Sequence, residues 1–398
     1  MKRIAFIPCG VLPIPAVKGG AVENLVQQLL DLNERYAEYE IIVYSPFDTE
    51  AILSSHEYKN TKFVFIKING LINKMRTAFY RTCGIVKSMA FTYDFQNHFL
   101  HEIIRDMKKR EKMDLIILEN APKYAIEIRK NFHMSKIIQH YHNIPEEQHI
   151  WKSIDSHTDC YFCISNFIKE KVKLIFHTDE KKAKVFYNCI NTSRFYRTES
   201  TQREALKEQI GLRKDDFVVI YTGRLQAYKG VKELLKGFSH INEKNIKLLI
   251  VGGSFYSGGK KNKFIRELEK IANGMDNKPI FTGFVPYETI PNYYAIADVA
   301  AVPSLWEEPF ALTALEAMAS GLPVIATKTG GLPEVVDDSC AILLDKDNHL
   351  PRNIAQSILH LFEDHELHRK MSIASFHRAA KFKIDNYWKN FNQLINNI

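Results

Sequence analysis

The sequence lacks a long apolar run, because no stretch approaches the roughly 18 residues that a membrane-spanning helix requires. Its opening residues, MKRIAFIPCG, are broken too early by Pro8 and Gly10 to form the apolar core of a signal peptide. We interpret them as a first β-strand. These absences lead us to expect a cytoplasmic protein, whose attachment to the inner face of the cell membrane, if any, would be peripheral.

Cysteine is scarce, and the common glycine-rich nucleotide motifs are missing. The six cysteines are scattered, and one Cys-x-x-Cys, Cys160 and Cys163, lies inside a strand-like run without a second pair. That pattern predicts a buried, reduced pair rather than a zinc or redox site. Neither a G-x-G-x-x-G nor a Walker sequence follows the first strand, so no standard phosphate-binding motif is indicated there.

Positive charge is in excess, with a formal net charge of +8. Between residues 67 and 112, ten lysines and arginines stand against four acids and are interleaved with large apolar residues. This pattern fits peripheral contact with an anionic membrane, and it fits equally a solvated pair of helices with one buried face. A nucleic-acid partner is disfavoured, because no nucleic-acid fold signature accompanies the charge. The oligomeric state stays open.

Short apolar runs separated by helical segments occur in two series, with a polar stretch near 192–200 between them. Strands that alternate with helices predict a parallel sheet covered on both faces. We expect an α/β protein of two doubly wound, Rossmann-like domains, 1–195 and 196–377, with the deepest cleft between them. A C-terminal helix, about 378–398 within the helical run 374–398, would cross back to the first domain. The expected strands are 3–8, 41–45, 63–66, 114–119, 136–143, 160–165 and 184–188, then 217–224, 247–253, 280–284, 298–304, 322–327 and 341–345.

The stretch 302–337 carries the strongest chemical signal. Glu308 precedes Pro309, which is favoured at the first helical position, and the apolar run to Ala319 predicts a buried helix that contains Glu316. The free amides of residues 310–312 would form an anion site at the helix start. An anion site between two carboxylates suits a ligand with phosphates and hydroxyls, such as a sugar nucleotide.

Other loops at the expected strand ends offer cations, glycines and imidazoles. Arg224 and Lys229 follow a strand and are punctuated by glycines, so they could hold a diphosphate or be two surface cations. Gly19-Gly20, after the first strand, could contact phosphate or form a plain turn.

Metal binding has two weak candidates in the sequence. His140 and His142 end a strand of the first domain, where His142 and Asn143 could bond a sugar hydroxyl; with Glu146 and Glu147 they could also bind a metal. The Asp345-x-Asp347 pair is better interpreted as a solvated turn than as a metal-bound nucleotide site.

Taken together, the motifs resemble those of retaining glycosyltransferases of family 4, which have the GT-B fold. The signature is EPFALTALEAMASGLPVIATKTGGLPEVV, with the Glu-x7-Glu spacing met by Glu308 and Glu316. Supporting motifs follow in family order: the Gly19-Gly20 loop, His142, GRLQAYKG, GFVPYETIPNYYAIADVAAVPS and the C-terminal helix. The segment PCGVLPIPAVKGGAVE resembles a subgroup linked to bacterial capsule, cell-wall and spore-coat sugars. Asn143 stands where the family usually has aspartate.

The resemblance implies a role for each matched residue. Glu316 would bind the ribose, Glu308 the hydroxyls of the donor sugar, and His142 would lie near C6 of that sugar. The catalytic residues would be Glu308, His142, Arg224 and Lys229. The donor-binding residues would be Gly19, Gly20, Arg224, Lys229, Phe284, Val285, Glu308, Pro309, Phe310, Ala311, Leu312 and Glu316, with the main chain at Phe284–Val285 reading the base.

The expected function is transfer of a hexose, with retention at the anomeric carbon, from a nucleoside diphosphate sugar to a glycan or a polyprenyl-diphosphate-linked acceptor. Family frequency favours a UDP-sugar, and we expect neither a metal nor another cofactor. Two rival functions are a GT-B sugar-nucleotide epimerase and a non-catalytic coat or scaffold protein that binds sugar nucleotide.

Overall fold

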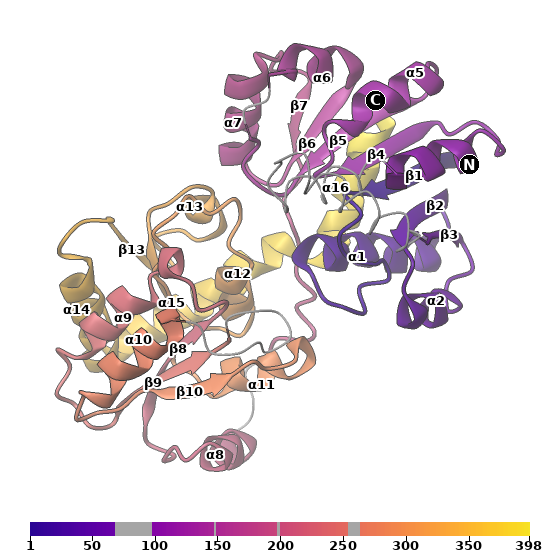
Figure 1. Cartoon of the computed structure of the whole chain (residues 1–398). Coiled ribbons are helices and arrows are strands. Elements are labelled where there is room, and N and C mark those ends of the chain that lie inside the picture. Colours follow the sequence, from indigo (N-terminus) through magenta and orange to yellow (C-terminus); the bar gives the residue numbers. More distant parts are fainter. Residues whose placement is uncertain (68–97, 147–148, 197–199, 254–262) are drawn as a thin grey trace, which may run out of the picture. The chain divides into compact units, whose positions relative to one another are not determined.

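The computed structural model describes residues 1–67, 98–146, 149–196, 200–253 and 263–398. The chain divides into two compact units (Figure 1), the first of Met1–Phe186 with Trp388–Ile398 and the second of Tyr187–Tyr387. The second unit thus begins a little earlier, and ends a little later, than the domain bounds expected from the sequence. Most of the basic segment 67–112 lies outside the described residues; of the rest, 98–107 is helical.

Unit 1 is a parallel sheet of seven strands in the order β3-β2-β1-β4-β5-β6-β7. Its central strands are continuous apolar runs, as expected of strands buried on both faces. The strands are β1 Lys2–Pro8, β2 Tyr39–Pro46, β3 Thr61–Ile66, β4 Leu115–Glu119, β5 Lys136–Tyr141, β6 Cys160–Cys163 and β7 Ala183–Val185. The helices are α1 Ala21–Tyr36, α2 Thr49–Ser55, α5 Tyr124–Asn131, α6 Trp151–His157 and α7 Asn166–Phe176.

Unit 2 is a parallel sheet of six strands in the order β10-β9-β8-β11-β12-β13. Helices α9 and α14 contribute apolar side chains, among them Leu234 and Ile358, to one core with β8, β9 and β11. The strands are β8 Phe217–Thr222, β9 Ile246–Val251, β10 Ile280–Gly283, β11 Val299–Val302, β12 Val324–Thr327 and β13 Ala341–Leu344. The helices are α8 Ser200–Gln209, η1 Ala227–Lys229, α9 Val231–Phe238, α10 Lys263–Asn273, η2 Tyr287–Thr289, α11 Ile290–Ala295, α12 Leu312–Ala319, α13 Leu332–Val335, α14 Leu350–Glu363 and α15 His365–Ala379.

The single C-terminal helix expected from the sequence is in fact three elements. Helix α15 ends at Ala379, η3 spans Ala380–Phe382, and α16 spans Ile384–Asn396 (yellow in Figure 1). The interruption is Lys383, whose extended backbone pairs with Ile190. Most of α16 belongs to unit 1, where Trp388 stacks on Tyr36 with ring centroids 5.7 Å apart. The predicted return of the chain to the first domain is therefore confirmed.

Each sheet has a point where the strand order reverses, between β1 and β4 in unit 1 and between β8 and β11 in unit 2. Open α/β sheets bind ligands outside the carboxyl ends of the strands at such a point. The loops after these four strands therefore define where a site should be sought. Among the described residues, no helix is long and apolar enough to cross a membrane.

Candidate functional site

The loop after β8 carries both expected cations of unit 2. Arg224 follows Gly223, whose φ of 137° suits only glycine, and the Arg224 carbonyl accepts a hydrogen bond from the Tyr221 hydroxyl at 3.0 Å. Lys229 lies on η1 and is followed by Gly230, with φ 70°. A Cβ at Gly230 would overlap the carbonyl oxygen of Pro303, so this glycine lets the Lys229 loop lie against the loop after β11.

Glu308, in the loop after β11, is brought to Lys229 by that close approach. The Lys229 Nζ lies 2.6 Å from Glu308 Oε1, and the Ser304 hydroxyl donates to the same oxygen at 2.7 Å. The glutamate is 6% exposed. Its main chain is held by the glycine turn before α13: Gly331 N–H donates to the Glu308 carbonyl at 2.6 Å, and a Cβ at Gly330 would overlap that oxygen.

The helix after Glu308 begins later than the sequence predicted. Pro309 is not its first residue; α12 starts at Leu312, with Ala311 as N-cap. The Leu312 N–H donates to the Phe310 carbonyl at 3.2 Å, so this amide is not free, as the expected anion site at residues 310–312 had assumed. Pro309 and Phe310 precede the helix, and Phe310 is buried against Tyr187 and Phe382. The N-terminal amides of α12 are therefore those of Leu312, Thr313 and Ala314, two residues further along than expected.

Glu316 lies inside α12 and is buried, with 7% of its surface exposed. The Tyr294 hydroxyl lies 3.1 Å from Glu316 Oε2, and Tyr287 forms a second hydrogen bond to the carboxyl. Burial raises the pKa of Glu316 to about 7, against the lowering effect of the two tyrosines and Arg194. Arg194 stacks on the Tyr287 ring, 4.9 Å from its centroid. Neither tyrosine is among the site residues predicted from the sequence, although both lie in the motif GFVPYETIPNYYAIAD.

Phe284 and Val285, expected to read a base with their main chain, follow β10 at the carboxyl edge of the same sheet. Phe284 is 45% exposed, so its ring is accessible from solvent. Gly253, after β9, lies beside it: a Cβ there would be 3.5 Å from the Phe284 nitrogen. The loops after β8, β9, β10 and β11 thus form one edge that carries the expected donor residues of unit 2.

In unit 1, Gly19 and Gly20 precede α1 with φ values of 72° and 104°. A Cβ at Gly20 would overlap the carboxylate of Glu23, which is 6% exposed. Gly20 is also the N-cap of α1 and has no side chain to cap it. The expected phosphate contact thus falls on a helix N-terminus that only glycine fits.

His142 follows β5 and lies in a buried ionic cluster that the sequence analysis missed. Its Nε2 is 2.6 Å from Oε2 of Glu119, at the end of β4, and His140 Nδ1 is 3.0 Å from the same oxygen. Hydrogen bonds and charge from the two imidazoles lower the pKa of Glu119 to about 2 despite complete burial. Burial, together with the charge of His140, lowers the pKa of His142. The register of β4 and β5 pairs Glu119 with His140, a contact that the sequence alone does not indicate.

The same three side chains are the described residues that could hold a metal ion in unit 1, since their ligand atoms lie within 4.8 Å of one another. The acids that the sequence analysis had paired with the histidines do not join them: Glu146 lies in the next loop, and Glu147 is outside the described residues. Asp345 and Asp347 are exposed in a turn, where Asp347 accepts the His349 N–H at 2.8 Å.

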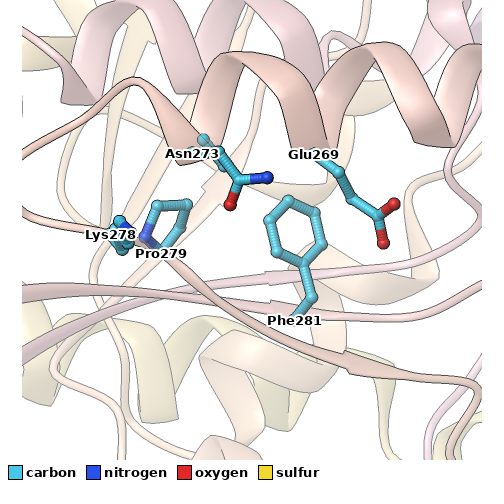
Figure 2. Close-up of a pocket in the computed structure, with 6 residues that line it drawn as sticks. Glu269, Asn273, Lys278, Pro279 and Phe281 are labelled. Atoms are coloured by element: carbon cyan, nitrogen blue, oxygen red, sulfur yellow. The ribbon is translucent and has the colours of Figure 1, made fainter.

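Two pockets lie in very different positions. One, of about 270 Å³, is formed in unit 1 by the loops after β4 and β5, and includes Asn120, Lys123, Tyr141 and Asn143. The Asn120 side chain accepts a hydrogen bond from the main-chain N–H of His142 at 2.9 Å, so this pocket adjoins the buried cluster of Glu119, His140 and His142. The other, of about 360 Å³, is shown in Figure 2 between α10 and the amino end of β10, with Glu269 and Phe281 in its wall. It contains none of the expected site residues.

Comparison with known proteins gives four consistent findings. Residues 202–378 match the family model of glycosyl transferases group 1. The putative glycosyltransferase YtcC of Bacillus subtilis is 26% identical over all of this chain and 92% of its own length. The lipopolysaccharide 1,2-N-acetylglucosaminetransferase of Salmonella typhimurium is 26% identical over 74% of this chain and 75% of its own. The crystal structure of HepE from Anabaena in complex with UDP has a TM-score of 0.77 over both whole chains, at 18% identity.

Proposed function

We propose that this chain, whose residues 202–378 match the glycosyl transferases of group 1 and whose fold is GT-B, transfers a hexose from a UDP-sugar to a glycan or lipid-linked acceptor, with retention at the anomeric carbon. The observation that carries the proposal is the contact of Lys229 with Glu308 at 2.6 Å, where the strand order of the unit 2 sheet reverses. A cation for phosphate and an acid for sugar hydroxyls meet at that point.

The donor is proposed to occupy the carboxyl edge of unit 2. Glu316 would accept hydrogen bonds from the two ribose hydroxyls, which would take the place of Tyr287 and Tyr294 as its partners. Lys229 and Arg224 would bind the diphosphate, and Glu308 would then hold the sugar hydroxyls. HepE was crystallised with UDP and with UDP-glucose, and that supports the choice of a uridine donor.

Charge stabilisation is the proposed source of catalysis. As the bond between the anomeric carbon and the phosphate oxygen breaks, negative charge gathers on the diphosphate, where Lys229 and Arg224 would stabilise it. The acceptor hydroxyl oxygen forms the new bond on the same face of the sugar, and its proton passes to the departing phosphate oxygen. The two cations provide the charge that a metal would otherwise supply, so we propose that no metal is needed.

The acceptor is proposed to bind unit 1. The pocket after β4 and β5 presents aromatic and amide groups, and the buried hydroxyl of Tyr141 in its wall has no partner among the described residues. Such groups suit a sugar ring. The relative from Salmonella acts, by its name, on lipopolysaccharide, which supports an acceptor in cell-surface polysaccharide synthesis. Peripheral contact with an anionic membrane through 67–112 remains part of the proposal.

The test is incubation of the full-length protein with a panel of nucleotide sugars, with and without lipid-linked glycan acceptors, in the presence of EDTA. Acceptor-dependent release of UDP, with an α-linked product from an α-linked donor, is the expected result. Donor conversion without acceptor would instead identify an epimerase, and binding without turnover a scaffold. Loss of activity in EDTA that manganese restores would overturn metal independence.

Variants of the two cations test the site itself. Lys229→Ala and Arg224→Ala should each lower kcat by about 10²-fold, because each removes one contact that stabilises the leaving diphosphate. Lys232→Ala is the matched control, since Lys232 lies on α9 and pairs with Glu267 on the exposed surface. Near-normal turnover in both site variants would contradict the assignment of Lys229 and Arg224 to the leaving diphosphate.

A further inference from the structure

The buried cluster of unit 1 contains an acid that the proposed reaction has not used. Glu119 ends β4, and one of its oxygens, Oε2, lies at hydrogen-bond distance from both His142 and His140. All three side chains are almost completely buried. Burying a carboxylate costs free energy unless the carboxylate is paired. Glu119 is paired with two imidazole rings, and it holds both of them in place.

The contact fixes which nitrogen of His142 carries the proton. An ionised carboxylate has no hydrogen to give, so the ring nitrogen 2.6 Å from it, Nε2, has to be the donor. His142 is favoured in its neutral form by burial and by the neighbouring His140, and a neutral imidazole has one N–H. Nδ1 is then a bare acceptor, and it is buried without a partner among the described residues.

We propose that Glu119 is a positioning residue that holds His142 in the Nε2–H tautomer, so that Nδ1 accepts a hydrogen bond from a substrate hydroxyl. The inference rests on the proposed function for the identity of that hydroxyl, which would belong to a sugar. In this arrangement a carboxylate binds one nitrogen of an imidazole and thereby fixes the ring so that its other nitrogen can accept a hydrogen bond. His140 contacts the same carboxylate oxygen. Asn120 holds the main chain of His142, because its side-chain oxygen accepts the main-chain N–H of His142 at 2.9 Å.

The other charged groups that face His142 are Glu23, from α1, and His140, from its own strand. Glu23 acts on His142 through its charge, and burial raises the pKa of Glu23. These groups bias how much charge the ring carries. Contact with the carboxylate of Glu119 is what distinguishes one ring nitrogen from the other.

The test reads the tautomer directly. Full-length protein labelled with [15N]histidine is studied by long-range proton–nitrogen NMR, and the signal of His142 is identified by its loss in His142→Gln. The wild type should show the Nε2–H form. Glu119→Ala should populate the Nδ1–H form and lower kcat by about 10²-fold, while Glu119→Gln, whose amide oxygen can still accept, should retain most of the Nε2–H form.

Glu23→Gln is the matched control, because it neutralises a second buried acid near the ring; it should leave the tautomer as in the wild type. An Nδ1–H form in the wild type, or no change in Glu119→Ala, would overturn the inference. So would one equivalent of zinc in the purified wild type that Glu119→Ala fails to retain. A wild type that turns over no nucleotide sugar but shows the expected tautomers would refute the proposed function instead.

Discussion

Two glutamates, Glu119 in unit 1 and Glu316 in unit 2, are both buried, yet their pKa values are shifted in opposite directions. Glu316 of unit 2 is paired with neutral hydroxyls, and its pKa rises to about 7. Glu119 of unit 1 is paired with imidazoles, and its pKa falls to about 2. Burial penalises the charge in both. The comparison teaches that the partners, not the depth, decide whether a buried acid is ionised at neutral pH.

The largest effect should come from neutralising Glu119. Its folded pKa lies below the ordinary value of 4.5, so its contribution to stability is present above pH 4.5 and is lost as the pH falls towards 2. Glu119→Gln should therefore lower the free energy of unfolding of unit 1 by about 3 kcal/mol at pH 7, and by much less at pH 3. Urea unfolding followed by tryptophan fluorescence measures this. Equal stability of variant and wild type at pH 7 would contradict the assignment of charge.

The same substitution at Glu316 should have the opposite sign. Its folded pKa lies above 4.5, so its contribution is fully present below pH 4.5 and is lost as the pH rises through about 7. Glu316→Gln should thus be more stable than the wild type at pH 8, by about 3 kcal/mol, and nearly equal to it at pH 4. Fluorescence of Trp306 reports on unit 2. A variant less stable than the wild type at pH 8 would break the comparison.

Binding of UDP should show the same titration if ribose hydroxyls donate to Glu316. About a tenth of a group with a pKa near 7 is ionised at pH 6, and about nine tenths at pH 8, so affinity should rise about 10-fold between them. Isothermal titration calorimetry measures the affinity across that range. Glu316→Gln is the control, since it should remove the pH dependence while weakening binding. A flat profile in the wild type would exclude Glu316 from the ribose contact.

The smallest effect should come from Tyr294, whose hydroxyl donates to Glu316 at 3.1 Å. Tyr294→Phe removes a hydrogen bond worth about 1 kcal/mol to the ionised form, so the midpoint of the UDP affinity profile should move to higher pH. Its neighbour Tyr293 provides a matched control, and Tyr293→Phe should leave the midpoint unchanged. The two profiles are compared by the same calorimetric titration, and identical midpoints would remove Tyr294 from the network.

The fold was predictable from the sequence because parallel strands buried on both faces are written as apolar runs, and each predicted run is a strand. The GT-B architecture followed from those runs and from the resemblance. The start of α12 was not predictable: Pro309 fits a first helical turn, but Phe310 packs against Tyr187 and Phe382, and the helix begins only at Leu312. The preference of proline for the first helical position was thus outweighed by burial of the Phe310 ring.

The candidate site was predictable where one loop carries the chemistry, and less so where contacts cross the sheet. Glu308, Lys229 and His142 could be named because they stand in motifs. Glu119 could not, since a single acid at a strand end looks like a surface residue until the register of β4 and β5 sets it beside His140. The register of neighbouring strands is a tertiary fact that a single sequence does not contain.

The two units are built from different segments of the chain, and this affects the order in which they can fold during synthesis. Unit 2 is one continuous segment, Tyr187–Tyr387, whereas unit 1 requires Trp388–Ile398 in addition to its first 186 residues. Because domains fold as they leave the ribosome, unit 2 can complete its core while unit 1 still lacks the rings of Trp388 and Phe391 that cover Tyr39. The half of the molecule that is translated first is therefore the half that is finished last.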